Sequence, residues 1–151
     1  MREILFRGKR IDNGEWVFGS LLIDGEAHKP ASKENISFSK HYIVPETDAD
    51  NIQTRFNDGA FYLNTIAYHI IPETVGQFTG LTDKNGKKIF EGDIVQGKDR
   101  LEKHLEVFGY IDHKNGSFVI TGDFMTHYRW LDYDVEVIGN IHDNPELLGG
   151  E

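Results

Sequence analysis

The sequence predicts a mainly β protein, and three observations support this prediction. Turn signals built from glycine, asparagine and aspartate recur at short intervals along the 151 residues. Most of them flank short runs rich in β-branched and aromatic residues, which is typical of antiparallel sheets. Candidate helices are scarce. We therefore expect many short antiparallel strands and a helical turn only near the C-terminus.

The first strong turn signal is Asp12-Asn13-Gly14, and it predicts a β-hairpin. Asparagine and glycine tolerate the positive φ that a tight hairpin turn requires. The flanking runs, residues 4–11 and 15–23, are the expected strands. Strand alternation places Trp16 and Phe18 on the same face of the second strand. The N-terminal region is therefore predicted to begin with a hairpin.

The segment between this hairpin and Pro72 has a weaker pattern. Residues 26–40 are polar and lack periodicity, which predicts a loop. A short strand is expected over residues 42–44, whereas residues 46–56 fit either a short helix or an irregular segment. Residues 64–71 predict a strand that ends at Pro72, because proline cannot donate to a strand ladder. We expect a boundary near Pro72, with regions 1–72 and 73–151, or one continuous domain.

The second half of the chain predicts a small barrel. Short strands are expected over residues 74–79, 87–90, 93–96, 106–111, 117–120 and 135–139. This many short strands in such a segment are typical of a closed or half-open barrel, since closure removes exposed edge strands. Asn144-Pro145-Glu146 then places a capping residue, a first-turn proline and an early acid in the order that opens a helix. A short C-terminal helical turn is therefore expected.

The amino-acid composition indicates the cellular compartment of the protein. The chain has no cysteine, so neither a disulfide nor a thiolate metal site can form, which favours a reducing intracellular environment. The N-terminus has only a short apolar run, far shorter than a signal peptide or a membrane span requires. We therefore expect a cytoplasmic protein without a membrane partner.

The formal net charge of -9 opposes binding to nucleic acid, because phosphate neutralisation supplies most non-specific affinity. The negative excess lies in residues 46–75 and 101–151. One basic strip interrupts it: Lys84, Lys87, Lys88, Lys98 and Arg100. Acidic residues alternate with these cations, so we interpret the strip as a solvated edge.

Two motifs with carboxylates resemble cation-binding or acid/base sites, but their residue spacing favours turns. Glu91-Gly92-Asp93 could bind a cation or share acid and base roles. Glycine between the acids usually marks a bend, so Asp93 is expected to cap the local turn. Asp83-Lys84-Asn85-Gly86 begins like a calcium loop, yet its glycine stands at the fourth position rather than the sixth. It is expected to be a hairpin turn, as is the segment 112–116.

The seven histidines show no metal-binding spacing, and no serine lies in a nucleophile elbow. Asp123, His127 and Asp132 could meet around one loop, which gives an enzyme hypothesis its only basis. We therefore predict no catalytic residue, no cofactor and no metal site.

An aromatic segment over residues 124–131 provides the candidate interaction surface. Tyr128, Arg129 and Trp130 belong to the residue types enriched at protein interface hot spots. Strand alternation offers another reading, in which Tyr128 and Trp130 share a face and bury into the core. Both readings remain open at the level of sequence.

Three segments resemble the YopX-like proteins of phages and prophages. Residues 77–95 read Q-F-T-G-L-T-D-K-N-G-K-K-I-F-E-G-D-I-V, residues 137–148 read V-I-G-N-I-H-D-N-P-E-L-L, and the N-terminus reads R-E-I-L-F-R-G-K-R. The resemblance implies a mainly β protein whose C-terminal part is an SH3-type barrel. It implies a phage or prophage gene in a bacterial host, and it implies no activity.

The functional hypothesis is a non-enzymatic phage accessory protein that acts as a protein-interaction module. It would bind a protein partner or associate with itself, and a homo-oligomer fits the short strands and exposed aromatics. The alternative is a nucleic-acid-associated SH3-like barrel protein in phage replication or regulation, which rests on analogy between folds.

Overall fold

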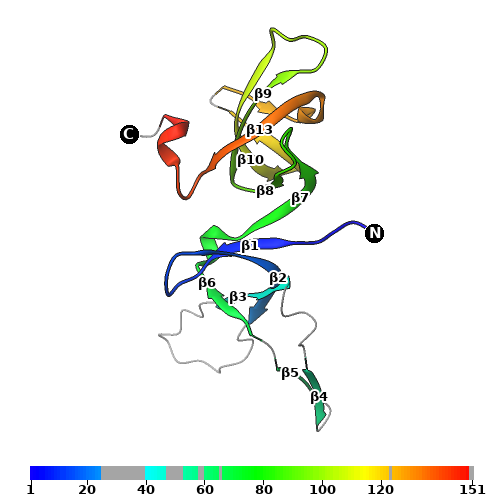
Figure 1. Ribbon diagram of the computed structural model, residues 1–151, viewed down its shortest axis with the longest axis vertical. Helices are drawn as coiled ribbons and strands as arrows, with labels where there is room; N and C mark the ends of the chain where they lie inside the picture. The colour runs from blue at the N-terminus through cyan, green and yellow to red at the C-terminus, as the bar shows by residue number, and fades with distance from the viewer. Residues whose placement is uncertain (25–39, 47–52, 58–59, 65, 123, 150–151) are drawn as a thin grey trace. The chain divides into compact units, whose positions relative to one another are not determined.

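A computed structural model describes residues 1–24, 40–46, 53–57, 60–64, 66–122 and 124–149. The chain forms two compact units (Figure 1): the N-terminal unit is Leu5–Val75, and the C-terminal unit is Gly76–Glu151 together with Met1–Ile4. The division after Val75 lies close to the boundary predicted at Pro72. Among the described residues, no helix has the length and apolar character needed to cross a bilayer.

The N-terminal unit contains the predicted hairpin. Its strands β1 (Phe6–Lys9) and β2 (Trp16–Asp24) pair in antiparallel register, with Lys9 opposite Trp16. Strands β3 (Lys40–Pro45) and β6 (Tyr68–Ile70) continue the sheet in the order β6-β3-β2-β1. The 3-10 helix η2 (Pro72–Thr74) follows. The sheet buries Ile43 and Ile70 completely, which gives this unit its apolar centre.

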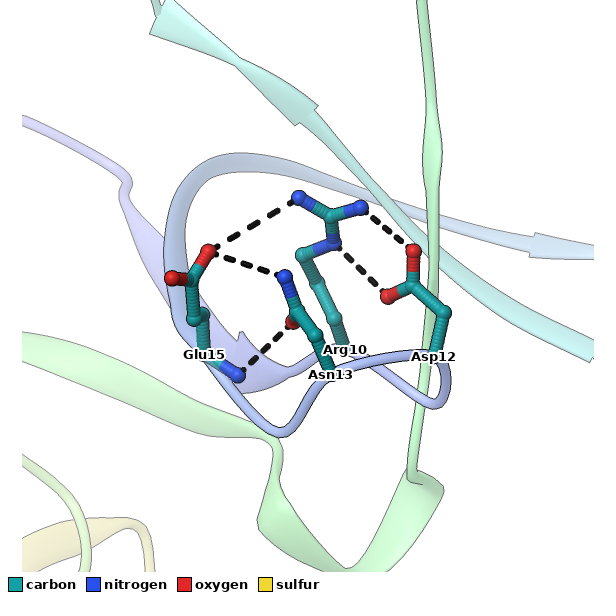
Figure 2. A network of polar contacts seen from close by, with 4 residues as sticks. All are labelled: Arg10, Asp12, Asn13 and Glu15. Carbon is teal, nitrogen blue, oxygen red and sulfur yellow. Dashed lines mark hydrogen bonds and ion pairs between the residues drawn. The ribbon is translucent and has the colours of Figure 1, made fainter.

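A polar network fixes the tip of the β1–β2 hairpin, as Figure 2 shows. The Arg10 guanidinium donates to both carboxylate oxygens of Asp12, at 2.9 and 2.5 Å, and it lies 4.2 Å from the centre of the Tyr68 ring. Asn13 donates to Glu15, whose backbone N–H donates back to the Asn13 side chain. This network is exposed, and its groups are engaged with one another.

The structure corrects the predictions for the segment before Pro72, where the sequence pattern was weak. Residues 53–56, predicted as helix or irregular chain, belong to strand β4 (Gln53–Asn57), which pairs with β5 (Ala60–Asn64). The predicted strand over 64–71 is shorter, because residue 64 ends β5 and β6 begins only at residue 68. The predicted loop over 26–40 lies outside the described residues except for its last residue, which begins β3.

All six predicted strands of the C-terminal unit overlap observed ones. They are β7 (Gly76–Thr82), β8 (Lys88–Phe90), β9 (Asp93–Asp99), β10 (Glu106–Lys114), β11 (Ser117–Thr121) and β13 (Tyr133–Asn140). A seventh, β12 (Thr126–His127), was not predicted. Two 3-10 helices, η3 (Trp130–Asp132) and η4 (Pro145–Leu148), complete the unit. Strands β9 to β13 form one antiparallel sheet in the order β12-β11-β10-β9-β13.

The sequence predicted a closed or half-open barrel, and no closed barrel is found among the described residues. Within the described residues β12 and β13 are the two ends of the five-stranded sheet and do not pair. The free edge of β13 is already bonded, since Val135 O accepts from Lys84 N at 2.9 Å and Val137 N donates to Asp83 Oδ2 at 3.0 Å. The β7–β8 turn therefore occupies this edge of β13. The five-stranded sheet is open, so the predicted SH3-type barrel is not confirmed.

One face of this sheet carries the core of the C-terminal unit. Its buried cluster is Ile89, Val95, Val107, Ile111, Ile120, Trp130 and Val135. Gly109 permits close packing, because a Cβ there would lie 2.3 Å from the Thr121 carbonyl oxygen. The predicted C-terminal helical turn is confirmed as η4. Its capping residue acts differently from the prediction, because the Asn144 side chain accepts from Asn140 N at 3.3 Å and makes no cap bond.

Candidate interaction surface

The candidate surface lies at the end of the five-stranded sheet where β9 and β11 finish and β10 and β13 begin. Two connections cross this end: the β9–β10 loop, residues 100–105, and the connection from β11 to β13, residues 122–132. They are joined by a backbone hydrogen bond of 3.0 Å from Arg100 N to Asp132 O. Figure 1 shows the β9–β10 loop at the top of the C-terminal unit. This bond links the two connections at the same end of the sheet.

Large apolar side chains gather on these two connections. Their exposed fractions are 92% for Leu101, 43% for Leu105, 100% for Phe124, 62% for Met125, 55% for Tyr128 and 56% for Leu131. We call these six residues the apolar end surface. Residues 124–131 were selected by sequence, whereas the two leucines of the β9–β10 loop were missed. The available signal was their isolation among charged residues between two strands.

Tyr128 and Arg129 of the predicted trio are both exposed. Arg129 is the more exposed, with 89% of its side chain accessible, and its guanidinium lies 3.3 Å from a carboxylate oxygen of Asp132. An open groove of about 370 Å³ runs beside them. Its lining residues are Asp99, Thr126, His127, Tyr128, Arg129, Asp132 and Tyr133. The His127 ring meets the Tyr133 ring edge-on, with centroids 5.9 Å apart.

Trp130 does not belong to that surface, which corrects its place in the predicted trio. Its side chain is 4% exposed, and its indole N–H donates to the Phe118 carbonyl oxygen at 2.8 Å. Strand alternation would put Tyr128 and Trp130 on one face, but Tyr128 stands in a turn and Trp130 begins η3. The local backbone therefore separates them. Trp130 anchors the connection, and its neighbours remain exposed.

The residues of the enzyme hypothesis do not form a site in the described structure. Asp123 lies outside the described residues. His127 is engaged with Tyr133, and Asp132 is paired with Arg129. Across the described part of the chain, no three histidine, aspartate or glutamate side chains converge as metal ligands.

Four of the five cations of the basic strip pair with neighbouring acids, as expected of a solvated edge. Its ion pairs are Lys84–Glu136 at 2.8 Å, Lys88–Glu3 at 2.6 Å, Lys98–Glu106 at 3.2 Å and Arg100–Asp134 at 2.8 Å. Lys84 and Lys98, together with Lys103, line an open groove of about 670 Å³ over the outer face of β9, β10 and β13. The same groove is lined by Glu106, Asp134 and Glu136, so both charge signs occur there.

Asp83 is a buried acceptor, which confirms the interpretation of its motif as a turn. Its Oδ1 accepts from Asn85 N at 2.8 Å and from Lys87 N at 2.9 Å, and its Oδ2 accepts from Val137 N. Burial raises the pKa of Asp83, but the three backbone donors outweigh it and hold the pKa below the ordinary 3.8. The Asp83 carboxylate therefore has a structural role, as the acceptor of three backbone hydrogen bonds.

Asp93 also has the predicted structural role. It is 1% exposed, and its Oδ2 accepts from Phe90 N at 2.8 Å across the bend at Gly92. The segment 112–116 is a hairpin turn as expected, since Lys114 pairs with Ser117 around Asn115 and Gly116. Asn115 has φ of 52° and Gly116 has φ of 80°, the conformation that favours these two residue types.

Comparison with known proteins identifies the family. The family described as YopX protein matches residues 5–149 of this chain. The chain belongs to the YopX family. Among solved structures, this YopX chain is similar to the crystal structure of protein EF1440 from Enterococcus faecalis, at 25% identity and a TM-score of 0.54. That match covers 98% of this chain and 99% of the other. No curated protein matches the sequence.

The YopX resemblance and the candidate surface involve different residues. Residues 77–95, which carry the strongest resemblance, form β7, β8 and the start of β9. Residues 137–148 form the end of β13 and η4. Their acids Asp83 and Asp93 bond to the backbone, whereas the apolar end surface lies between these two segments in the chain. The residues that mark the family therefore build the framework that carries the surface.

Proposed function

We propose that this YopX chain is a non-enzymatic interaction module that binds a protein through the apolar end surface. The observation that carries the proposal is the exposure of six large apolar side chains on two adjoining connections. Several large apolar side chains left exposed at one end of a sheet are typical of sites that bind another protein. A phage or prophage accessory role in the bacterial cytoplasm belongs to the same proposal.

The composition of the surface supports a protein partner. Tyrosine, phenylalanine, methionine and arginine are enriched at interfaces, and here Tyr128, Phe124, Met125 and Arg129 come from one connection. Burying exposed apolar area stabilises a complex by about 25 cal/mol per Å² before the costs of association are counted.

The connection is also held by the core, which lowers the cost of ordering it on binding. Trp130 lies within the buried cluster and donates its indole N–H to Phe118. Gly122 N donates to Met125 O at 3.0 Å, which closes the turn before β12. These contacts hold the backbone at both ends of the exposed segment.

Site-specific photo-crosslinking tests the proposal. A photoreactive phenylalanine analogue replaces Tyr128 in one variant and Ile11, which is 52% exposed in the N-terminal unit, in the control. We expect position 128 alone to crosslink one defined protein in the bacterium that carries the gene. The added change Met125→Ser should abolish that product. Equal labelling from both positions, or none from 128, contradicts the proposal.

One observation favours the nucleic-acid alternative. Lys84, Lys98 and Lys103 line the same groove on the outer face of the sheet, as a site for phosphates would require. The carboxylates of Glu106, Asp134 and Glu136 line it too and oppose a polyanion. A gel-shift titration, argued in the Discussion, separates the two functions.

A further inference from the structure

The chain contains three asparagine-glycine pairs, and each lies in the connection between two strands: Asn13-Gly14, Asn85-Gly86 and Asn115-Gly116. Glycine has no side chain to shield its backbone nitrogen, so an asparagine before it is open to spontaneous deamidation. The glycine nitrogen forms a bond to the asparagine Cγ, and the side-chain amide leaves with the proton of that nitrogen as ammonia. Water then opens the cyclic imide at either carbonyl and gives aspartate or isoaspartate.

The pair Asn13-Gly14 is held by hydrogen bonds at both reacting groups. Gly14 N donates to the Arg10 carbonyl oxygen at 3.0 Å. The Asn13 side chain donates to Glu15 Oε2 at 2.9 Å and accepts from Glu15 N at 2.9 Å (Figure 2). Attack would have to break the bond at the nitrogen and rotate a side chain that is bonded through both of its polar atoms. The polar network at the hairpin tip therefore opposes deamidation of Asn13.

The pair Asn85-Gly86 is held in a similar way. Gly86 N donates to the Asp83 carbonyl oxygen at 2.9 Å. Asn85 N donates to the Asp83 carboxylate at 2.8 Å, and the Asn85 side-chain amide donates to Glu136 Oε1 at 3.3 Å. The attacking nitrogen and the leaving amide are both engaged, so this pair is opposed as well.

The pair Asn115-Gly116 differs from the other two in its hydrogen bonds. All three pairs are exposed, so exposure does not separate them. Within the part of the chain that the structure describes, no hydrogen bond engages the Asn115 side chain or Gly116 N. Asn115 also has φ of 52°, a left-handed conformation that is costly for residues other than glycine. Attack needs Asn115 to rotate out of this conformation, and no bond of its side chain resists that rotation.

We infer that Asn115 is a site of spontaneous deamidation, and that the reaction changes the β10–β11 hairpin. The aspartate product tolerates the left-handed conformation, so it keeps the turn. The isoaspartate product adds a methylene to the backbone of a two-residue turn, whose length sets the strand register. Strands β10 and β11 supply Ile111 and Ile120 to the buried cluster, so this product should be less stable. The inference goes beyond the proposed function and does not depend on it.

Peptide mapping by mass spectrometry tests the site on the full folded chain, incubated at mildly alkaline pH. We expect Asn115 to deamidate at least about fivefold faster than Asn13 or Asn85, because breaking one hydrogen bond of ordinary net strength slows a step by about that factor. In denaturing urea the three rates should become similar, since all three pairs have the same local chemistry. Equal rates in the folded chain, or an order that persists in urea, overturn the inference.

The variant Asn115→Gly is the unreactive control, because two glycines allow the same turn and carry no side-chain amide. Incubation should lower the urea midpoint of the wild type and leave that of Asn115→Gly unchanged. The variant Asn115→Asp carries the aspartate product alone and should unfold close to the fresh wild type. If incubation lowers the midpoint of Asn115→Gly equally, the damage lies elsewhere and the inference is wrong. An isoaspartate fraction that unfolds like the fresh protein contradicts the effect on the hairpin.

Discussion

The Asp83 carboxylate accepts a hydrogen bond of 3.0 Å from the backbone N–H of Val137, 54 residues later in the chain. The bond ties the β7–β8 turn to the free edge of β13. The same carboxylate also accepts from two backbone N–H groups within its own turn. One buried side chain thus orders a turn and covers a sheet edge, so its loss should affect both.

The substitution Asp83→Asn should lower the free energy of unfolding by about 1–3 kcal/mol. An asparagine side chain keeps one acceptor oxygen, but its amide group donates and would face a backbone donor. Asp83 is 7% exposed, so water cannot readily replace the lost bond. Urea unfolding at neutral pH measures the difference.

Asp12→Asn is the matched control, because Asp12 is an exposed carboxylate paired with Arg10. An exposed ion pair contributes about 0–1 kcal/mol, so this variant should remain close to the wild type. Equal losses in the two variants would show that the buried bonds of Asp83 contribute no more than a surface pair.

The stability supplied by Asp83 should depend on pH. The pKa of Asp83 is lower in the folded chain than its ordinary value of 3.8, so the unfolded chain binds the proton more readily. The contribution is therefore complete above the ordinary value and disappears as the pH falls through the lowered folded pKa. Urea unfolding of wild type and Asp83→Asn should differ most near neutral pH, and the two should converge as the pH falls below the folded pKa of Asp83. A difference that stays constant into strong acid contradicts this assignment.

Truncation of Trp130 should lower the free energy of unfolding strongly, whereas truncation of Tyr128 should hardly change it. Trp130→Ala empties part of the core and leaves the Phe118 carbonyl without its donor, so it should cost about 3–5 kcal/mol. Tyr128→Ala should change stability by less than about 0.5 kcal/mol, because its side chain is 55% exposed. Urea unfolding measures both variants. A large loss from Tyr128→Ala would mean that its ring packs within its own chain and is unavailable to a partner.

Turn chemistry made much of the fold predictable. Gly14, Asn115 and Gly116 have a positive φ and lie in turns that join two strands. In the C-terminal half, Asn85-Gly86, Gly92, Asn115-Gly116 and Gly122 divide the chain into short runs that were predicted as strands. The segment between residues 46 and 57 was harder to predict, since residues 53–57 read Q-T-R-F-N and have a single apolar residue, so no periodicity separates a strand from a helix.

The candidate site was only partly predictable because its geometry depends on one 3-10 helix. The residue types of the segment 124–131 pointed to an interface, and Tyr128 and Arg129 are exposed. Period-two reasoning placed Trp130 in the core correctly but failed at Tyr128, because Tyr128 stands in a turn and Trp130 begins η3, so the two do not share a strand face. Sequence also left open whether the predicted barrel is closed or half-open, and no closed barrel is found among the described residues. The bond between Asp83 and Val137 at the edge of β13 joins residues far apart in the chain, and such a contact leaves no local pattern.

Gel-shift titration with single- and double-stranded DNA should show no complex at low salt. Lys98 and Arg100 lie 3.2 and 2.8 Å from the carboxylates of Glu106 and Asp134, so phosphates would have to displace acids already in place. Binding to nucleic acid through cations weakens steeply as salt rises, which makes low salt the most permissive condition. The variant Glu106→Gln/Asp134→Asn frees these cations and should raise any weak affinity. A wild-type complex that tightens as salt falls would instead favour the nucleic-acid function over the interaction module.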